Sequence, residues 1–267
     1  MRNVFLSAVA AAGLLSTSAQ AADLMPVKAP APAALAVAPS WGGFYVGLFA
    51  GYGWGDAKAT EPTDPALPFP FYNGTNVPYR FNADGFFGGG TVGYNMQSGA
   101  FVYGLEGEVG YLGLRGSLID PNGTIFFGTP DTVTSFKSGL YGALYGRLGV
   151  AADNALFYSK FGVAFLDAKA STIDACGDGS PQCGTFTLTM TGSKVMAGWS
   201  AGAGVEWMFS SNWSAKIEYA YFDFGNIGTA GPSNQPGEFY RQTIDVTAHT
   251  VKFGVNRRWG GPVVARY

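Results

Sequence analysis

Apolar and polar residues alternate along much of this chain, which is the period-two pattern of a β-strand with two different faces. The stretch from Phe44 to Trp54 reads F-Y-V-G-L-F-A-G-Y-G-W, and similar segments rich in glycine and aromatic residues recur as far as Trp259. Eight segments are predicted as strands, at about 43–55, 83–97, 100–115, 136–151, 155–170, 190–209, 213–225 and 242–259.

Short and long connections alternate between these strands. The short ones, at 97–100, 152–154 and 210–212, consist mainly of turn-forming residues, and the long ones lie at about 56–82, 116–135, 171–189 and 226–241. The order predicts an all-β fold, an eight-stranded antiparallel transmembrane β-barrel, because a closed barrel pairs every strand hydrogen bond within lipid. Four long loops are expected on the outer side and three short turns in the periplasm.

The N-terminus has the pattern of an export signal. Arg2 is followed by an apolar run from Val4 to Leu15 and by the small-x-small site Ala19-Gln20-Ala21, so residues 1–21 are predicted to be a cleaved signal peptide. The remaining organisation is then a Pro/Ala-rich periplasmic linker at 22–40, a barrel at 41–259 and a C-terminal tail at 260–267. A soluble secreted β-protein with the same signal is the alternative.

Composition favours the membrane over the soluble alternative. Only 13% of residues are charged and 15% are aromatic, with a formal net charge of −2. Few charges and many aromatic residues suit a surface that faces lipid in the outer membrane. The near-neutral charge argues against a nucleic-acid partner.

Charged residues on the predicted strands fall mostly on the faces that point into the barrel. Four acids and four bases are expected there: Glu106, Glu108, Glu206 and Glu218 with Arg147, Lys160, Lys216 and Lys252. Unpaired charges in a narrow interior are costly, so these residues are predicted to form ion pairs that plug the barrel. The alternative is a charged constriction that selects ions, which favours an excess of one sign.

Two further features are candidate chemical sites. Cys176 and Cys183 are predicted to form a disulfide in the third outer loop, worth about 2–3 kcal/mol, since an exported chain meets an oxidising compartment. His249 is the sole histidine, and its parity places it on the lipid face near the outer interface, without a visible catalytic serine or orienting carboxylate. No catalytic, metal or cofactor site is therefore predicted, and an enzyme that modifies outer-membrane lipids is a distant alternative.

Four separated segments resemble the alphaproteobacterial outer-membrane immunogenic proteins, a short porin family with an OmpA-like eight-stranded barrel. They are W-G-G-F-Y-V-G-L-F-A-G-Y-G-W-G, G-W-S-A-G-A-G-V-E-W, K-I-E-Y-A-Y-F-D-F-G and H-T-V-K-F-G-V-N. The resemblance covers about 41–259 and implies an abundant surface barrel without enzymatic activity. Family members usually end at the aromatic residue of the last strand, whereas eight residues follow Trp259 here.

The resemblance implies two further roles. An insertion signal read by the barrel-insertion machinery is assigned to Val251, Phe253, Val255 and Trp259. Cleavage after Ala21 exposes Ala22 followed by Asp23, the kind of N-terminus through which related barrels are joined to peptidoglycan. The expected function is structural, with surface contact to host or environmental ligands; the alternative is a small-solute porin. Expected partners are outer-membrane lipids, the insertion machinery, peptidoglycan and surface ligands.

Overall fold

The computed structural model describes residues 40–60, 78–119, 132–175 and 185–260, which are almost entirely β-strand. The strands are β1 (Gly43–Thr60), β2 (Tyr79–Ser98), β3 (Phe101–Leu112), β4 (Arg115–Ile119), β5 (Thr132–Ala152), β6 (Ala155–Ala175), β7 (Thr187–Ser210), β8 (Trp213–Pro232) and β9 (Phe239–Trp259). Among these residues, no helix is long and apolar enough to cross a membrane.

Several sequence predictions lie outside the described residues. They are the signal peptide, the linker up to residue 39, the Cys176–Cys183 disulfide, the attachment residue Ala22 and the tail from residue 261.

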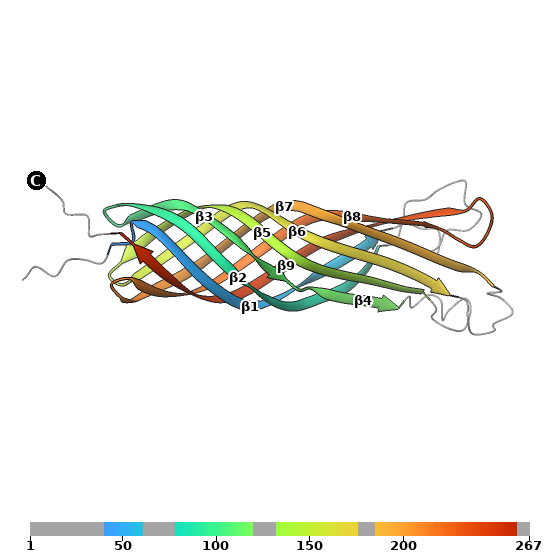
Figure 1. Cartoon of the computed structure of the whole chain (residues 1–267), viewed down its shortest axis with the longest axis horizontal. Coiled ribbons are helices and arrows are strands. Elements are labelled where there is room, and N and C mark those ends of the chain that lie inside the picture. Colours follow the sequence, from blue (N-terminus) through green and yellow to red (C-terminus); the bar gives the residue numbers. More distant parts are fainter. Residues whose placement is uncertain (1–39, 61–77, 120–131, 176–184, 261–267) are drawn as a thin grey trace, which may run out of the picture. The chain divides into compact units, whose positions relative to one another are not determined.

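The sheet closes on itself, as Figure 1 shows. Strands pair antiparallel with their neighbours in the chain, and β1 pairs with both β2 and β9. β3 and β4 follow one another in the same position between β2 and β5, separated only by Gly113 and Leu114. The ring therefore has eight positions, which confirms the predicted antiparallel barrel and refines its third strand into two.

Three two-residue turns join the strands at one end of the barrel. They are Gly99–Ala100, Asp153–Asn154 and Ser211–Asn212. Gly99 and Asp153 have φ angles of 59° and 51°, the left-handed region that such tight hairpins require and that Gly and Asp tolerate. The predicted short turns are confirmed, and both the start of β1 and the end of β9 lie at this end (Figure 1).

The pairing register fixes the stagger of the closed sheet and with it the tilt of the strands. A path that starts at Phe44 and moves on each strand to the directly opposite residue of the next strand returns to β1 at Trp54, ten residues further along. The residues on this path are Tyr94, Leu105, Gly146, Phe161, Ala201, Tyr221 and His249. With the strand tilt of roughly 40° usual in barrels, ten residues rise about 25 Å.

Aromatic residues stand at both ends of this rise. Phe44 packs on Trp259 near the turns, with ring centroids 5.8 Å apart. Ten residues along the same strands, Trp54 stacks on His249 at 6.0 Å, and we call this level the upper aromatic girdle. An apolar band about 25 Å tall between two aromatic girdles is typical of barrels that span an outer membrane.

The two faces of a strand exchange character at the upper girdle, and β9 shows this most clearly. Between Trp259 and His249 the outward residues other than Arg257 are apolar (Val251, Phe253 and Val255), and the inward ones other than Gly254 are polar, among them Thr250, Lys252 and Asn256. Beyond His249 the outward residues are polar and the inward ones apolar: Thr243, Asp245 and Thr247 against Ile244, Val246 and Ala248. The barrel thus continues past the girdle as a second zone, called here the outer extension.

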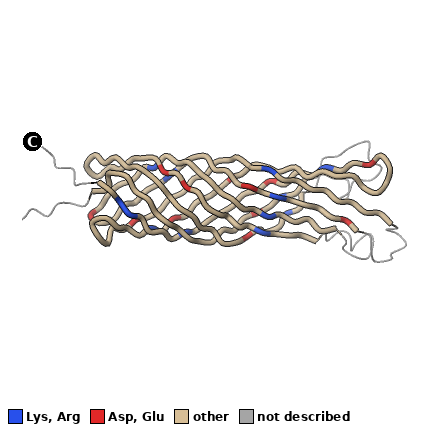
Figure 2. The backbone as a smooth tube through the Cα atoms, in the orientation of Figure 1, with Lys and Arg blue, Asp and Glu red and all other residues tan. Residues whose placement is uncertain are grey.

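The outer extension corrects the predicted loops. The loop expected at 226–241 is strand up to Pro232 and again from Phe239, which leaves a six-residue connection. The other three expected loops likewise begin and end with strand residues. In the outer parts of β1, β2 and β9 the alternation continues with its faces exchanged, so a search for apolar outward residues misses these segments. Figure 2 shows the corresponding charge pattern: coloured segments gather in two zones along the barrel, separated by a nearly uncharged stretch.

Candidate functional site

The interior of the barrel contains a group of buried charged side chains, here called the ion-pair network. Its members are Glu106 and Glu108 on β3, Arg147 on β5, Lys160 on β6, Glu206 on β7, Lys216 and Glu218 on β8, and Lys252 and Arg258 on β9. None is more than 5% exposed. They meet because every second residue of a strand points inward, and because the barrel is narrow enough for long side chains to cross it.

Glycines make room for this crossing. Gly93 faces Tyr45, and a Cβ atom at this glycine would lie 2.3 Å from the tyrosine ring. A Cβ atom at Gly204 would lie 2.7 Å from the hydroxyl of Tyr158. Any larger residue at these two positions would therefore displace a tyrosine that donates a hydrogen bond to the network.

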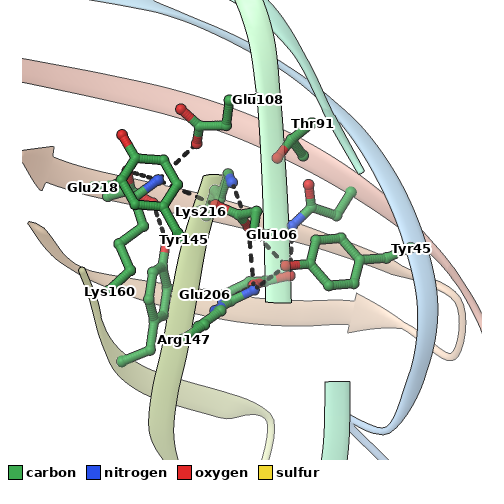
Figure 3. Close-up of polar contacts among 12 residues, drawn as sticks. Tyr45, Thr91, Glu106, Glu108, Tyr145, Arg147, Lys160, Glu206, Lys216 and Glu218 are labelled. Carbon is green, nitrogen blue, oxygen red and sulfur yellow. Dashed lines mark hydrogen bonds and ion pairs between the residues drawn. The ribbon is translucent and has the colours of Figure 1, made fainter. Parts of the chain in front are cut away.

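Lys160 forms the upper part of the network with three carboxylates (Figure 3). Its Nζ lies 3.1 Å from Glu106 Oε1, and 2.7 Å from Oε1 of both Glu108 and Glu218. Lys252 also pairs with Glu108, and its Nζ lies 2.9 Å from Glu218 Oε1. Several charges share partners here, so removing one cation affects more than one carboxylate.

The same three carboxylates have the arrangement of a metal site, with one oxygen from each lying within 4.8 Å of the others. Oxygen ligands in such a group suit hard divalent cations. The ammonium of Lys160 contacts all three residues, however, and so takes the position that a bound cation would need. The chemistry of this cluster is that of an internal counter-ion.

Glu206 is the centre of the lower part, nearer the turns. Its carboxylate accepts hydrogen bonds from Arg147 Nη2 at 2.5 Å and Arg258 Nη2 at 2.6 Å. Ser214 Oγ donates to it at 2.5 Å and Asn256 Nδ2 at 2.8 Å. Four donors on one buried carboxylate compensate the cost of removing its charge from water.

Tyrosines connect the charges to the barrel wall. Tyr45 donates to Glu106 Oε2 at 2.7 Å, Tyr158 to Glu218 Oε2 at 2.8 Å, and Tyr141 to Glu108 Oε2 at 2.9 Å. The guanidinium of Arg147 lies 3.7 Å from the centroid of the Tyr158 ring, a favourable cation–π contact. These phenol groups donate hydrogen bonds to the carboxylates and also hold them in position.

Apolar side chains close the interior on both sides of the network. Towards the turns, the buried ring of Trp41 lies under the Arg258 guanidinium at 4.6 Å, and Arg258 Nη1 donates to the Trp41 carbonyl at 2.8 Å. On the other side, the ring of Phe222 packs edge-on against Tyr141 at 5.7 Å and stacks on Phe224 at 5.3 Å. The interior is therefore filled in three successive layers.

The structure brings all eight sequence-predicted charged residues together in this interior. The sequence reasoning missed Arg258, although it lies on the same face of β9 as Lys252 and Asn256. With Arg258 the network has five bases and four acids, so the predicted balance of charge is corrected by one cation. The three tyrosines were also missed, because parity shows that they face inward but not which carboxylate they reach.

His249 lies on the outward face, half-buried among aromatic rings. Its Nδ1 is 2.6 Å from the Tyr219 hydroxyl, and its ring lies 5.1 Å from that of Tyr221. These contacts place it in the upper aromatic girdle, as its parity indicated.

The residues assigned to the insertion signal also face outward along β9. Phe253, Val255 and Trp259 are 62%, 43% and 45% exposed, and Val251 is partly exposed. Arg257, which interrupts this row, lies 5.2 Å from the Trp259 ring and 5.7 Å from the Trp213 ring.

The chain is similar to known proteins in sequence and in structure. The family model described as outer membrane protein beta-barrel domain matches residues 7–258. The 31 kDa outer-membrane immunogenic protein of Brucella melitensis is 30% identical over 97% of this chain and 100% of its own length. A 22 kDa outer membrane protein of Rhizobium leguminosarum is 30% identical over 70% of this chain and 66% of its own. Among solved structures, OprG from Pseudomonas aeruginosa is similar with a TM-score of 0.47 and 11% identity, covering 82% of this chain and 97% of that one.

Proposed function

Since the chain belongs to the outer membrane protein beta-barrel family, we propose that it is a non-conducting barrel with a structural and surface-interaction role in the bacterial outer membrane. The observation that carries this proposal is the filled interior. Trp41, the ion-pair network and the Phe222 layer succeed one another along the barrel, and their side chains are buried.

A porin needs a water-filled passage lined by polar side chains. Here Lys216 on β8 reaches Glu106 on β3, on the opposite side of the ring, and Lys252 on β9 reaches Glu108 on β3. These ion pairs cross the interior. A passing ion would have to separate these buried pairs. Each separated charge would then be left without a partner and without water, which is costly in free energy.

Conductance in planar bilayers tests this proposal against the porin alternative. The wild-type barrel is expected to give no large, steady, ion-selective current steps. The matched comparison is the variant Arg147→Ala/Phe222→Ala, which truncates one side chain in each of two layers and is expected to raise conductance if it remains folded. Steady selective steps from the wild-type protein would establish a porin.

Support for a surface role comes from the outer extension, which carries polar residues outward well beyond the upper girdle. Envelope integrity and surface contact can be separated by genetic complementation. A strain that lacks the protein is expected to become sensitive to detergent. A barrel whose three longer connections are shortened should restore detergent resistance without restoring attachment to host or environmental surfaces. Restoration of both would leave the loops without a recognition role.

We expect no enzymatic activity, since the charged groups of the interior are engaged with one another and His249 with Tyr219. Mass spectrometry of outer-membrane lipids with and without the protein is the test. Identical lipid profiles are expected, and a modified lipid present only with the protein would support the enzyme alternative.

A covalent link to peptidoglycan through Ala22 is proposed on the sequence resemblance. Sacculi boiled in detergent and digested with trypsin should retain the peptide from Ala22 to Lys28, still attached to a muropeptide. Recovery of that peptide only with a free amine would show that the barrel is held by lipid alone.

A further inference from the structure

Three basic residues form a row across three neighbouring strands of the outer extension. Arg115 on β4 is directly opposite Lys137 on β5, and Lys137 is directly opposite Lys169 on β6. All three side chains are exposed on the outward face. Adjacent strands lie about 4.8 Å apart, so the row concentrates three positive charges within roughly 10 Å.

This arrangement is unfavourable without an anion, because like charges directly opposite each other destabilise a sheet. Lys137 has a basic neighbour on both sides. Within the described ranges, none of the three residues has an ion-pair partner. Arg115 faces Asp84 on β2, but the Asp84 carboxylate accepts a hydrogen bond from Tyr52 instead.

A different arrangement occurs beside the row, on the neighbouring strands β1 and β2. Lys58 on β1 is also opposite a basic residue, Arg80, but its other neighbour is Asp245 on β9. That basic pair therefore has a carboxylate in register beside it, whereas the centre of the Arg115–Lys137–Lys169 row has none.

The height of the row on the barrel wall indicates which layer of the membrane its charges face. Tyr111, Leu140 and Phe165 lie three or four residues nearer the turns on the same strand positions and are 49%, 70% and 46% exposed. They belong to the upper edge of the apolar band. Three or four residues of a tilted strand rise about 8–10 Å, which places the backbone of the row at or just beyond the outer limit of the polar headgroup layer, roughly 5–8 Å from the hydrocarbon. Long basic side chains can also bend towards that layer.

We propose that Arg115, Lys137 and Lys169 bind the phosphate groups of a phosphorylated glycolipid in the outer leaflet. We choose this ligand because its charge is complementary to the row. Phosphate oxygens accept hydrogen bonds from guanidinium and ammonium groups, and a headgroup with several charges can span adjacent strands. The acyl chains of such a lipid would lie against Leu140 and Phe165, directly beneath the row. The site is independent of whether the interior conducts.

The test uses the full-length barrel refolded in detergent and titrated with diphosphorylated lipid A, with the same lipid after phosphatase treatment, and with inorganic phosphate. The variant Arg115→Gln/Lys137→Gln/Lys169→Gln is compared with Lys58→Gln/Arg80→Gln/Arg241→Gln, which removes equal charge elsewhere on the extension. We expect the row variant to lose at least tenfold in affinity for the phosphorylated lipid and the control variant to change less than threefold.

A second readout separates a lipid site from a purely structural effect. Relief of like-charge repulsion should raise the urea midpoint of the row variant in phosphate-free vesicles, whereas loss of the bound lipid should lower it in vesicles that contain lipid A. Equal lipid affinity for the two triple variants, or undiminished binding after phosphatase treatment, would overturn the proposal. Competition by inorganic phosphate at equal concentration would reassign the row to free anions. If the row variant fails to refold, Lys137→Gln alone carries the same comparison.

Discussion

The guanidinium of Arg147 on β5 lies 2.5 Å from the carboxylate of Glu206 on β7, and neither side chain is accessible to solvent. The two strands are not adjacent, since β6 lies between them. The ion pair therefore bridges over β6 on the inside of the barrel and joins two strands that no backbone hydrogen bond connects directly.

Replacing Arg147 with alanine should destabilise the barrel by about 3–5 kcal/mol, because it leaves a buried carboxylate without its main partner. The control is Arg80→Ala, which removes an exposed outward arginine and should change stability by less than about 0.5 kcal/mol. Urea titration of both refolded variants measures the difference. Coincident midpoints would show that the interior charges carry no stability of their own.

Lys160→Met should also destabilise the barrel, since three carboxylates lose a shared cation. Part of that loss should return in Lys160→Met/Glu108→Gln, which also removes one of the negative charges. A coupling energy of about 1–3 kcal/mol in the double-mutant cycle is expected for residues in direct contact. Additive effects would mean that Lys160 and Glu108 act independently.

Because the faces of β9 exchange character at His249, a charged residue on its outward face should be destabilising on the turn side of His249 and tolerated beyond it. Phe253 lies about midway between the two aromatic girdles, so Phe253→Lys should cost about 2–4 kcal/mol of folding free energy in lipid vesicles. Thr243→Lys, on the same outward face but in the outer extension, should cost less than about 0.5 kcal/mol. Similar costs at both positions would place the membrane boundary elsewhere.

Proteinase K added to intact cells should cut in the three longer connections and spare the fourth. The connection from Ser233 to Glu238 is held by hydrogen bonds, including Asn234 N to the Thr187 carbonyl at 2.9 Å and Ser233 Oγ to Glu238 at 2.8 Å. Mass spectrometry of the released peptides identifies the sites. Complete protection of all the connections would reverse the assigned topology.

Deleting residues 260–267 should leave insertion into the outer membrane intact, because β9 ends at Trp259 and its outward apolar residues precede that position. The measurement is the amount of heat-modifiable barrel in the outer-membrane fraction, with Trp259→Ala as the comparison. If the deletion abolishes the signal and Trp259→Ala does not, Tyr267 supplies the terminal aromatic residue instead.

The sequence alone was sufficient for the number of strand positions, the short turns and the inward direction of Glu106, Lys160 and Lys252. These features depend on parity and turn chemistry, which are local. It was insufficient for the partners of each charge, because contacts between strands that are not adjacent depend on the tilt and stagger of the closed barrel. Arg258 was overlooked beside the better-marked apolar row of β9.

The outer extension was missed for a different physical reason. The expected strands were recognised by apolar residues on the lipid side, and beyond His249 that side faces water. The break between β3 and β4 was also missed, since it depends on how Gly113 and Leu114 fit between β2 and β5: Gly113 N donates to the Phe86 carbonyl, and Leu114 N to Ser138 Oγ. Such an irregularity has no periodic signal.

The position of Trp41 has a mechanical consequence. Its amide donates to Gln97 at 2.6 Å, its carbonyl accepts from Arg258, and its ring is buried in the barrel mouth just before β1 begins. A force applied to the chain N-terminal to this residue therefore loads a clamp made by β2 and β9 before it reaches the first hydrogen bonds of β1. The barrel can be tethered at this end without being unzipped from it.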